Sequence, residues 1–575
     1  IMSKISILPE LLINKIAAGE VIERPAAIVR ELIDNSIDAG ARTISVEILY
    51  GGKKLIKIAD DGTGMDRDDV ALCFERHATS KIKSEDDLFN ITTLGFRGEA
   101  LASIAAVSKV TLTTSTANSP VGTKIEIMPG QKKEITDAPS FSGTILEMRD
   151  VFYNTPARRK FLKSVSTEMS HIIETVTQKA LAYPEISFSL RHNDSEVINL
   201  PSAKDLRERF NQLYSEELFN KFLEVKKETR GIKLYGYVSA AEFARSAKTY
   251  QLIFINRRPV KNPAIAHAVY NVYKDLIPKD KHPAFFLFLD VDPQKVDVNV
   301  HPAKREVRFE SPDEIYRLVE SAIKEVLIPK QHKDISYAQI DDGQLSTVNS
   351  QRSFGSQFIR ETLESALESS RGMQSDFFTQ GVVPAIHRYF YIGESFYAEA
   401  TKDGLIIIDQ HAAHERVLYE KFLKKGKIEV ENLFLPVRVE LPAKEFNIVM
   451  DNKNIFHDFG LHIEEFGANS VIIRALPKEI NKADIKGLLL DVASVIFEEN
   501  IPAEDASKKE ELLKNIAAKL ACHKAVRGRE QLNNEELSHL IAELEKTEAP
   551  DKCPHGRPTR IFFSLYDLLK MFKRK

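Results

Sequence analysis

The stretch Arg30–Gly40, with the sequence RELIDNSIDAG, constrains the fold and chemistry of this chain more than any other segment. Pro25 lies a few residues earlier and favours the start of a helix there, because proline suits the first helical turn. Glu31 and Asn35 are four residues apart, so both project from one face of that helix. A carboxylate that can orient a water molecule, beside an amide oxygen that can bind Mg²⁺, suits hydrolysis of a phosphate ester. Such pairs are also common on solvated helices.

Two predicted strands follow, over residues 44–49 and 55–59, and the second delivers Asp60 to its tip. An acidic residue at a strand end, followed by two glycines, suits close approach of a ligand to the backbone. Taken alone, these residues are equally typical of an ordinary Asp-Gly turn. Glycines before a helix can present backbone N–H groups to phosphates. Gly95 and Gly98, in LGFRGEAL (94–101), are of this kind. The other segments of the series are DDGTGM (60–65), TSKI (79–82) and SGT (142–144), the last of which opens a strand.

Taken in this order, the segments resemble the nucleotide site shared by type II topoisomerases, heat-shock chaperone ATPases, histidine kinases and MutL, the GHKL ATPases. The chain contains no GxxxxGK[ST], so the resemblance is not to a P-loop protein. Over the amino-terminal third the resemblance to the MutL mismatch-repair family is close. The segments that carry it are INKIAAGEVIERPA, ELIDNSIDAGA, DDGTGM, TSKI, LGFRGEAL and VFYNTPARRKFL.

The resemblance implies an α/β sandwich with helices on one face of a mixed sheet, which binds ATP and Mg²⁺. It implies that Glu31 is the general base for the attacking water and that Asn35 is a Mg²⁺ ligand. The other ATP-binding residues that it implies are Asp60 at the adenine amino group, Gly64 beside the base, Thr79, Gly95 and Gly98 at the phosphate lid, Thr144 supporting the adenine site, and Lys304.

Residues 205–330 are predicted to form a second α/β unit, with strands over 235–238 and 251–255. Lys304 lies in the segment HPAK, and the resemblance implies that it reaches the γ-phosphate, so that ATP would lock the two domains together. Asp290 and Asp292 follow a hydrophobic strand and mimic a topoisomerase metal site, but we assign them to a turn. A basic segment is a candidate DNA-phosphate contact, although basic loops are common: Arg245, Lys248, Arg257, Arg258 and Lys261.

In the last third, a predicted strand ends at Asp409 and a helix carrying His411 and Glu415 on one face follows. Cys553 and His555 stand two residues apart much further along. Ligands of oxygen, nitrogen and sulfur together suit a transition metal, with the thiolate favouring Zn²⁺ and the carboxylates tolerating Mn²⁺. A single Cys-x-His pair is more often structural.

The segments DQHAAHERVLYE, ACHKAVR and CPHGRP resemble the carboxy-terminal domain of endonuclease-type MutL chains. The resemblance implies that Asp409, His411, Glu415, Cys553 and His555 hold the metals, with Cys522 close by. It also implies DNA nicking, a homodimer formed through this domain, and a MutS-like mismatch-recognition partner. The segment Glu431–Pro436 (ENLFLP) is similar to the QxxLxP motif that docks on the replication sliding clamp, but it has glutamate where glutamine is usual.

Length and composition fit a protein of several domains. The chain has 575 residues, a formal net charge of −3 and three cysteines, so a nucleic-acid surface must be local and no disulfide framework is expected. Without an apolar run long enough for a membrane helix, we expect a cytoplasmic protein of the bacterial cytosol or nucleoid. We therefore predict a GHKL ATPase domain (1–204), a second α/β transducer domain (205–330), a flexible linker (331–384) and an α+β dimerisation and endonuclease domain (385–575).

Two other functions fit parts of the sequence. An ATP-switched matchmaker, with a structural metal site and no nuclease activity, would carry the same motifs. A chaperone-like ATPase fits the nucleotide site but not the carboxy-terminal metal ligands.

Overall fold

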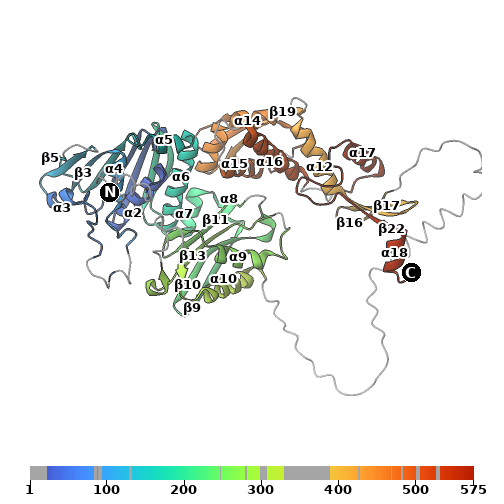
Figure 1. Cartoon of the computed structure of the whole chain (residues 1–575), viewed down its shortest axis with the longest axis horizontal. Helices are drawn as coiled ribbons and strands as arrows, with labels where there is room; N and C mark the ends of the chain where they lie inside the picture. Colours follow the sequence, from blue (N-terminus) through green and yellow to red (C-terminus); the bar gives the residue numbers. More distant parts are fainter. Residues whose placement is uncertain are drawn as a thin grey trace, which may run out of the picture. The chain divides into compact units, whose positions relative to one another are not determined.

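The computed structural model describes most of the chain outside residues 331–388 (Figure 1). The predicted linker (331–384), the segment around Lys304 and the first part of the amino-terminal motif lie outside the described residues. The described ranges are 22–82, 87, 93–128, 133–245, 248–278, 281–297, 307–328, 389–424, 428–467, 469–480, 484–499, 506–525 and 531–574.

The first part of the chain forms a mixed eight-stranded sheet in the order β5-β4-β3-β6-β2-β1-β7-β8. All neighbouring strands are antiparallel except β1 and β7, which are parallel. The strands are β1 (Thr43–Leu49), β2 (Leu55–Asp60), β3 (Lys109–Ser115), β4 (Gly122–Ile127), β5 (Glu134–Ala138), β6 (Gly143–Arg149), β7 (Ser187–His192) and β8 (Ser195–Leu200). The helices are α2 (Pro25–Asp38), α3 (Arg67–Leu72), α4 (Ala100–Val107), α5 (Pro156–Phe161) and α6 (Val165–Ala182).

Alternation of apolar residues explains why one face of this sheet is covered. Every second residue of β1 is buried, and the apolar stripes of α2, α4 and α6 join the same core. Helix α2 begins at Pro25 and ends at Asp38, as the position of the proline predicts. The predicted α/β sandwich is therefore confirmed. Helix α2 is largely buried against the sheet, and its polar motif lies on the helix itself.

The second part of the chain has a five-stranded sheet in the order β12-β11-β13-β10-β9. Strand β13 is buried on both faces, which explains its uninterrupted apolar sequence FFLFL. The strands are β9 (Phe222–Thr229), β10 (Ile232–Ser239), β11 (Gln251–Ile255), β12 (Arg258–Val260) and β13 (Phe285–Asp290), followed by the short pair β14 (Val296–Asp297) and β15 (Arg308–Phe309). The helices are α7 (Leu206–Leu213), α8 (Glu216–Phe219), α9 (Pro263–Tyr273) and α10 (Pro312–Leu327).

The carboxy-terminal part contains a four-stranded sheet, β16-β17-β18-β22, and a three-stranded sheet, β19-β21-β20. Its strands are β16 (Tyr389–Gly393), β17 (Phe396–Thr401), β18 (Gly404–Asp409), β19 (Val430–Glu440), β20 (His462–Glu465), β21 (Ser470–Pro477) and β22 (Arg560–Ser564). Its helices are α12 (Gln410–Leu423), α13 (Ala443–Asp451), α14 (Lys453–Asp458), α15 (Ile485–Glu499), α16 (Ala506–Ala525), α17 (Asn534–Leu544) and α18 (Leu565–Met571).

Among the described helices, none combines the length and apolar character needed to cross a membrane. Cys73, Cys522 and Cys553 all lie within the described residues, and none of them forms a disulfide bond.

Candidate functional site

Helix α2 places Glu31 and Asn35 side by side on one face, as predicted from their spacing. Glu31 is 9% exposed, and the guanidinium group of the neighbouring Arg30 donates to its carboxylate across 3.3 Å. Asn35 is partly buried, and its amide oxygen accepts a hydrogen bond from Lys81. The carboxylate and the amide oxygen that the chemistry needs therefore lie on the same helix face.

Asp60 ends strand β2 and contacts α2 through Ser36. Its carboxylate accepts hydrogen bonds from Ser36 Oγ (2.7 Å) and from the backbone N–H of Gly62 (3.0 Å). Burial raises the pKa of Asp60 above its ordinary value, although the bonds from Ser36 and Gly62 oppose that shift. Ser36 was missed by the sequence reasoning, although it lies within the same motif as Glu31 and Asn35.

Thr144 lies beside Asp60, and Gly64 packs against the end of strand β3. Thr144 is the cross-strand neighbour of Asp60 in β6, and its hydroxyl is 3.0 Å from that of Thr114. Gly64 has φ +68°, and a Cβ there would lie 2.1 Å from the carbonyl oxygen of Ser115. The close approach of β3 thus requires a glycine at this position, independently of any ligand. Thr114, which also accepts from the Met65 N–H, was not foreseen.

The segments containing Thr79 and Gly98 lie against each other. The N–H of His77 donates to the carbonyl of Gly98, and a Cβ on Gly98 would lie 2.5 Å from the Ala78 carbonyl oxygen. Gly98 also has φ +64°, which favours glycine. Thr79 Oγ1 accepts from the Lys81 N–H at 3.2 Å. The structure therefore brings together two motifs that are separate in the sequence, TSKI (79–82) and LGFRGEAL (94–101).

The last residue of α2, Asp38, binds the glycine segment. Its carboxylate oxygens accept from the N–H groups of Leu94 (2.9 Å) and Gly95 (3.0 Å). Lys81 Nζ lies 2.5 Å from the same carboxylate and 2.9 Å from the amide oxygen of Asn35. Sequence reasoning placed Gly95 at the site but missed Asp38 and Lys81, which both stand within the motifs that indicated the site.

The donor set at this end of α2 suits Mg²⁺. The amide oxygen of Asn35 and the carboxylate of Asp38 together already bind one cation, the ammonium group of Lys81. Oxygen ligands of this kind are the ones that Mg²⁺ prefers in proteins. These residues therefore fit the metal that the ATPase class implies.

The basic segment proposed as a DNA contact is partly engaged with protein groups. The prediction was wrong for Arg258, which is buried, whereas Arg257 is exposed and stays a prediction. Arg258 is 8% exposed and donates to the carbonyl oxygen of Thr93. Arg257 pairs with Glu185 at 2.5 Å. Asp292 caps a short 3₁₀ helix by accepting from the N–H of Gln294, which confirms its assignment to a turn.

Asp409 ends β18 and caps the amino terminus of α12. Its Oδ1 accepts from the N–H groups of His411 (2.9 Å) and Ala412 (3.2 Å), and from Ser395 Oγ (3.0 Å). The capping explains why α12 begins directly after this aspartate. It also means that one oxygen of Asp409 is committed to the helix, whereas its other oxygen has no such role in the cap.

Glu415, on the next turn of α12, is completely buried between two histidines. Its carboxylate oxygens lie 3.4 Å from His411 Nε2 and 3.3 Å from His555 Nδ1. Glu415, Cys553 and His555 each offer a ligand atom, and these atoms lie within 4.8 Å of one another. Carboxylate, thiolate and imidazole within this distance form a donor set that suits Zn²⁺ or a similar ion. We call these three residues the Glu415 cluster.

The electrostatics of the Glu415 cluster follow from this proximity. The hydrogen bond to Cys553, followed by that to Glu415, raises the pKa of His555 to about 9. Burial alone would raise the pKa of Glu415, but the hydrogen bonds from His411 and His555 outweigh it and hold that pKa well below its usual range. A buried carboxylate kept ionised beside two imidazoles is ready to bind a metal cation.

A tight turn presents Cys553 and His555 to α12. The N–H of Cys553 donates to the Arg557 carbonyl, and Gly556, with φ +81°, donates to the Cys553 carbonyl. Arg416 Nε donates to the Lys552 carbonyl at 2.6 Å and holds the turn against the helix. Cys522 is buried in α16 and does not belong to the Glu415 cluster in the part of the chain that the structure describes.

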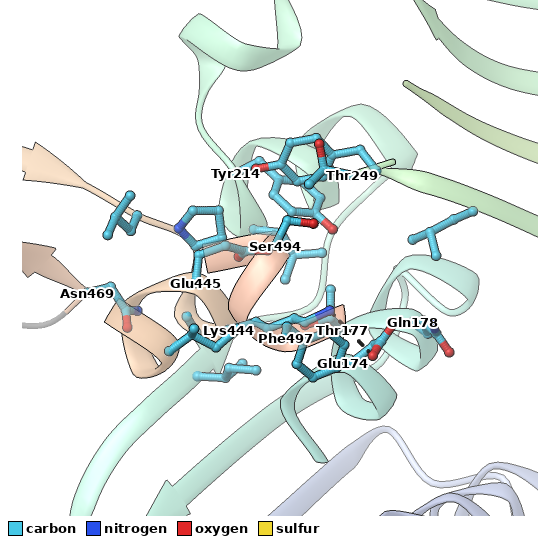
Figure 2. A pocket seen from close by; sticks show the side chains of 18 of the residues that line it. Glu174, Thr177, Gln178, Tyr214, Thr249, Lys444, Glu445, Asn469, Ser494 and Phe497 are labelled. Carbon is cyan, nitrogen blue, oxygen red and sulfur yellow. Dashed lines mark ion pairs between the residues drawn. The ribbon is translucent and has the colours of Figure 1, made fainter. Parts of the chain in front are cut away.

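A separate pocket carries none of the predicted ATP or metal residues (Figure 2). Its lining includes Glu174 of α6, Lys444 of α13 and Phe497 of α15. The ammonium group of Lys444 lies 3.8 Å from the centre of the Phe497 ring, a cation–π contact. The pocket thus lies apart from both candidate sites.

Comparison with known proteins identifies the class of the first domain. Residues 23–140 match the model described as histidine kinase-, DNA gyrase B-, and HSP90-like ATPase. These residues contain α2, the end of β2 and the glycine segments whose geometry is described above. The fold and this site define an ATPase of the GHKL class.

The rest of the chain narrows the class to one family. Residues 210–328 match the model of the DNA mismatch repair protein, C-terminal domain, and residues 392–532 match the MutL C-terminal dimerisation domain. The DNA mismatch repair protein MutL of Thermodesulfovibrio yellowstonii is 41% identical over 100% of both chains, and that of Caldanaerobacter subterraneus subsp. tengcongensis is 38% identical over 100% of both. The chain belongs to the MutL family of DNA mismatch repair proteins.

Among solved structures, the Aquifex aeolicus MutL ATPase domain complexed with ADP is 28% identical to this chain. The match covers 52% of this chain and 98% of that chain, with a TM-score of 0.36.

Proposed function

We propose that this MutL chain uses ATP binding and hydrolysis to close a dimer around DNA and to license nicking of one strand by a metal centre at the Glu415 cluster. The observation that carries the nuclease proposal is that cluster, because α12 and the distant turn at Cys553 converge to place a carboxylate, a thiolate and an imidazole within 4.8 Å. A structural turn would not need a fully buried, ionised glutamate at its centre.

In the ATPase domain, Glu31 would activate the water that attacks the γ-phosphate, and Asn35 would hold Mg²⁺. Asp60 would accept from the adenine amino group, with Ser36 and Gly62 keeping its carboxylate oriented. Gly95, Gly98 and Thr79 would line the phosphates. Lys304, which lies outside the described residues, would reach the γ-phosphate from the second domain.

At the nuclease centre, a bound Zn²⁺ or Mn²⁺ ion would supply charge that stabilises the departing oxygen of a phosphodiester and lowers the pKa of a water. Glu415, Cys553 and His555 would hold this ion. His411 lies 3.4 Å from Glu415 and Asp409 caps the same helix, which supports both as ligands of a second ion or of the attacking water. Asp409 and Glu415 are the residues that we propose as catalytic.

We propose that two copies of the chain pair through the sheet β16-β17-β18-β22 and helix α18. Large apolar side chains are exposed over these elements, whereas soluble proteins seldom expose so many together. The match to a dimerisation domain at residues 392–532 supports pairing through this part of the chain, and the exposed side chains support the choice of these elements. The exposed side chains are Phe390, Tyr391, Ile392, Phe396, Ile561, Phe562, Leu565, Tyr566 and Met571.

We propose three further partners, which membership of the family supports: DNA, a MutS-like mismatch-recognition protein and the replication sliding clamp. The candidate clamp segment, Glu431–Pro436, lies in β19 rather than in a loop before the next strand. The pairing of β19 with β21 is irregular between Asn432 and Val437, and Phe434 is 98% exposed within this bulge. An apolar ring pushed out of a strand is suited to docking into a partner's pocket.

We assign residues 1–204 to the ATPase domain, 205–330 to a transducer domain, 331–384 to a linker and 385–575 to the dimerisation and nuclease domain, and we place the protein in the bacterial cytoplasm. Each of the three described parts has its own sheets and helices, which supports these boundaries.

Nicking of supercoiled plasmid in Mn²⁺ tests the proposal. Wild type should convert supercoiled to open-circular DNA, and Glu415→Gln should not. Lys421→Gln, a charge-changing substitution on the same helix but outside the Glu415 cluster, is the matched control and should retain nicking. ATP hydrolysis without nicking in wild type would instead support the alternative, an ATP-switched matchmaker whose metal site is structural.

A further inference from the structure

The ammonium group of Lys81 lies where α2 ends, between two oxygen ligands from that helix. It is 2.9 Å from the amide oxygen of Asn35 and 2.5 Å from Asp38 Oδ2. The side chains of Lys81 and Asp38 are 19% and 7% exposed, so this ion pair is shielded from salt and solvent. Lysine provides a compact cation on a flexible stem, which can both fill such a position and leave it.

The same contact fixes the glycine segment. Asp38 accepts from the N–H groups of Leu94 and Gly95 through its two oxygens. A Cβ on Gly95 would lie 3.0 Å from Lys81 Nζ and 3.4 Å from Asn35 Oδ1, so the backbone of Gly95 passes directly over the Lys81–Asn35 contact. The carboxylate of Asp38 therefore binds the backbone donors that are proposed for phosphate, and Lys81 binds the oxygen that is proposed for Mg²⁺.

We propose that Lys81 is a built-in counter-cation of the nucleotide site, which Mg²⁺ must displace from Asn35 before the site is complete. The inference rests on the proposed role of Asn35 as a metal ligand. Lys81 is thus a positioning residue that sets how strongly nucleotide binding depends on the divalent cation.

The physical reason is competition for one oxygen. The Asn35 amide oxygen is within hydrogen-bonding distance of the Lys81 ammonium group, and a divalent cation at the same oxygen would lie beside a like charge. Mg²⁺ binding at Asn35 and the Lys81–Asn35 bond therefore oppose each other, because the two cations repel at this distance. Removing the ammonium group should leave Asn35 and Asp38 as two unopposed oxygen ligands, which favours binding of a divalent ion even without nucleotide.

Binding of Mn²⁺ in the absence of nucleotide tests the counter-cation proposal directly. It is measured as the decrease of the electron paramagnetic resonance signal of free Mn²⁺. All proteins are full-length chains carrying Glu415→Gln, so that the Glu415 cluster does not contribute. Lys81→Met and Lys81→Gln should bind Mn²⁺ at least about tenfold more tightly than the Lys81 parent, which corresponds to about 1.4 kcal/mol. Lys81→Gln provides a second neutral variant if Lys81→Met fails to fold. Adding Asn35→Ala should abolish the gain.

Lys109→Met is the matched control. Lys109 pairs with Asp150 at 2.8 Å on the surface of the same domain, so this change removes the same charge and also leaves an aspartate without its lysine. Its Mn²⁺ affinity should equal that of the parent. If both Lys81 variants bind Mn²⁺ no more tightly than Lys109→Met, the counter-cation proposal is wrong.

Failure of the underlying ATP-site assignment has a different signature. Binding of a fluorescent ADP analogue to the parent, with and without Mg²⁺, reports on that assignment independently. A parent that binds Mg²⁺–nucleotide through Asn35, combined with unchanged Mn²⁺ affinity in the Lys81 variants, would overturn only the role of Lys81. A parent whose nucleotide binding does not respond to Mg²⁺ or to Asn35→Ala would overturn the site assignment itself.

Discussion

The ammonium group of Lys179 in α6 is paired with the carboxylate of Asp34 in α2, and both side chains are buried, with exposures of 3% and 8%. Asp34 lies between Glu31 and Asn35 in the sequence. The ion pair therefore links α2, the helix that carries the candidate catalytic groups, to α6. A buried ion pair of this kind adds little net stability over apolar packing, but it is costly to break from one side.

Lys179→Met should therefore destabilise the ATPase domain by about 3–5 kcal/mol, because it leaves Asp34 buried without its partner. Because a chain of several domains does not unfold in one step, hydrogen exchange of the α2 amides is the appropriate measurement. The double variant Lys179→Met, Asp34→Leu should recover part of the loss. Lys124→Met, at an exposed pair with Glu126, should cost no more than about 1 kcal/mol. Equal exchange in all variants would contradict the argument.

Glu31→Ala should bind ATP with Mg²⁺ but lose turnover by about 10²–10⁴-fold, because the general base is removed while the nucleotide contacts remain. Asn35→Ala should also lose the metal dependence of binding. Steady-state phosphate release and nucleotide titration with and without Mg²⁺ measure the two effects. Near-normal hydrolysis by Glu31→Ala would show that another group activates the water.

The Ser36 hydroxyl should control the acid limb of nucleotide binding. Burial raises the pKa of Asp60, whereas the hydrogen bond from Ser36 favours the ionised form and lowers it. Protonation of Asp60 weakens its acceptance from the adenine amino group, so affinity falls as the pH drops through this raised pKa. In Ser36→Ala the pKa of Asp60 rises further, and the midpoint of the acid limb should move to higher pH.

Equilibrium binding of ADP across acidic pH measures this shift, since titration of the phosphates is common to all variants. Ser108→Ala is the matched control, because the Ser108 hydroxyl donates to the carbonyl of Ile104, four residues earlier, rather than to a carboxylate. Its acid limb should coincide with that of wild type. A limb that does not move in Ser36→Ala would show that Asp60 does not control binding.

The geometry of α12 sharpens a test of the nuclease. Asp409→Asn should abolish nicking yet keep α12 folded, because asparagine caps a helix as well as aspartate does. Glu415→Gln removes the charge but keeps the volume of this buried side chain, so α12 should also stay folded in this variant. Both variants should retain ATP hydrolysis, since Glu31 and Asn35 belong to a different domain. Simultaneous loss of both activities would indicate misfolding, and metal analysis of Cys553→Ser would show whether zinc leaves with this ligand.

Glu431→Gln should strengthen binding to the sliding clamp. Glutamine both donates and accepts hydrogen bonds, whereas ionised glutamate only accepts and must be desolvated. A missing buried donor costs about 1–3 kcal/mol, or roughly 5- to 150-fold in affinity, so clamp-stimulated nicking should rise in parallel. The double variant Phe434→Ala, Pro436→Ala should lose binding. Equal clamp affinity in all three proteins would show that the bulge in β19 is no docking site.

The amino-acid sequence by itself determined the fold class, the start of α2, the strand tips and most of the candidate ATP residues. These features are local: a proline begins a helix, a four-residue spacing places Glu31 and Asn35 on one face, and alternation selects the buried face of each strand. The sequence motifs also carried the resemblance to the MutL family, which the full-length relatives confirmed.

Only the tertiary structure decided which distant groups meet. The Lys81–Asn35 contact and the Lys179–Asp34 pair join residues separated by 46 and 145 positions, which no local periodicity encodes. The members of the Glu415 cluster, of which Glu415 and Cys553 are 138 positions apart, were grouped beforehand only through the family resemblance, and the structure supplies their proximity. Tertiary packing likewise turned Arg258 inward and exposed Phe434, although basic loops usually face solvent and apolar strand residues are usually covered. The reason is physical: burial and charge pairing depend on the elements that pack nearby, and the chain specifies those elements only through its whole fold.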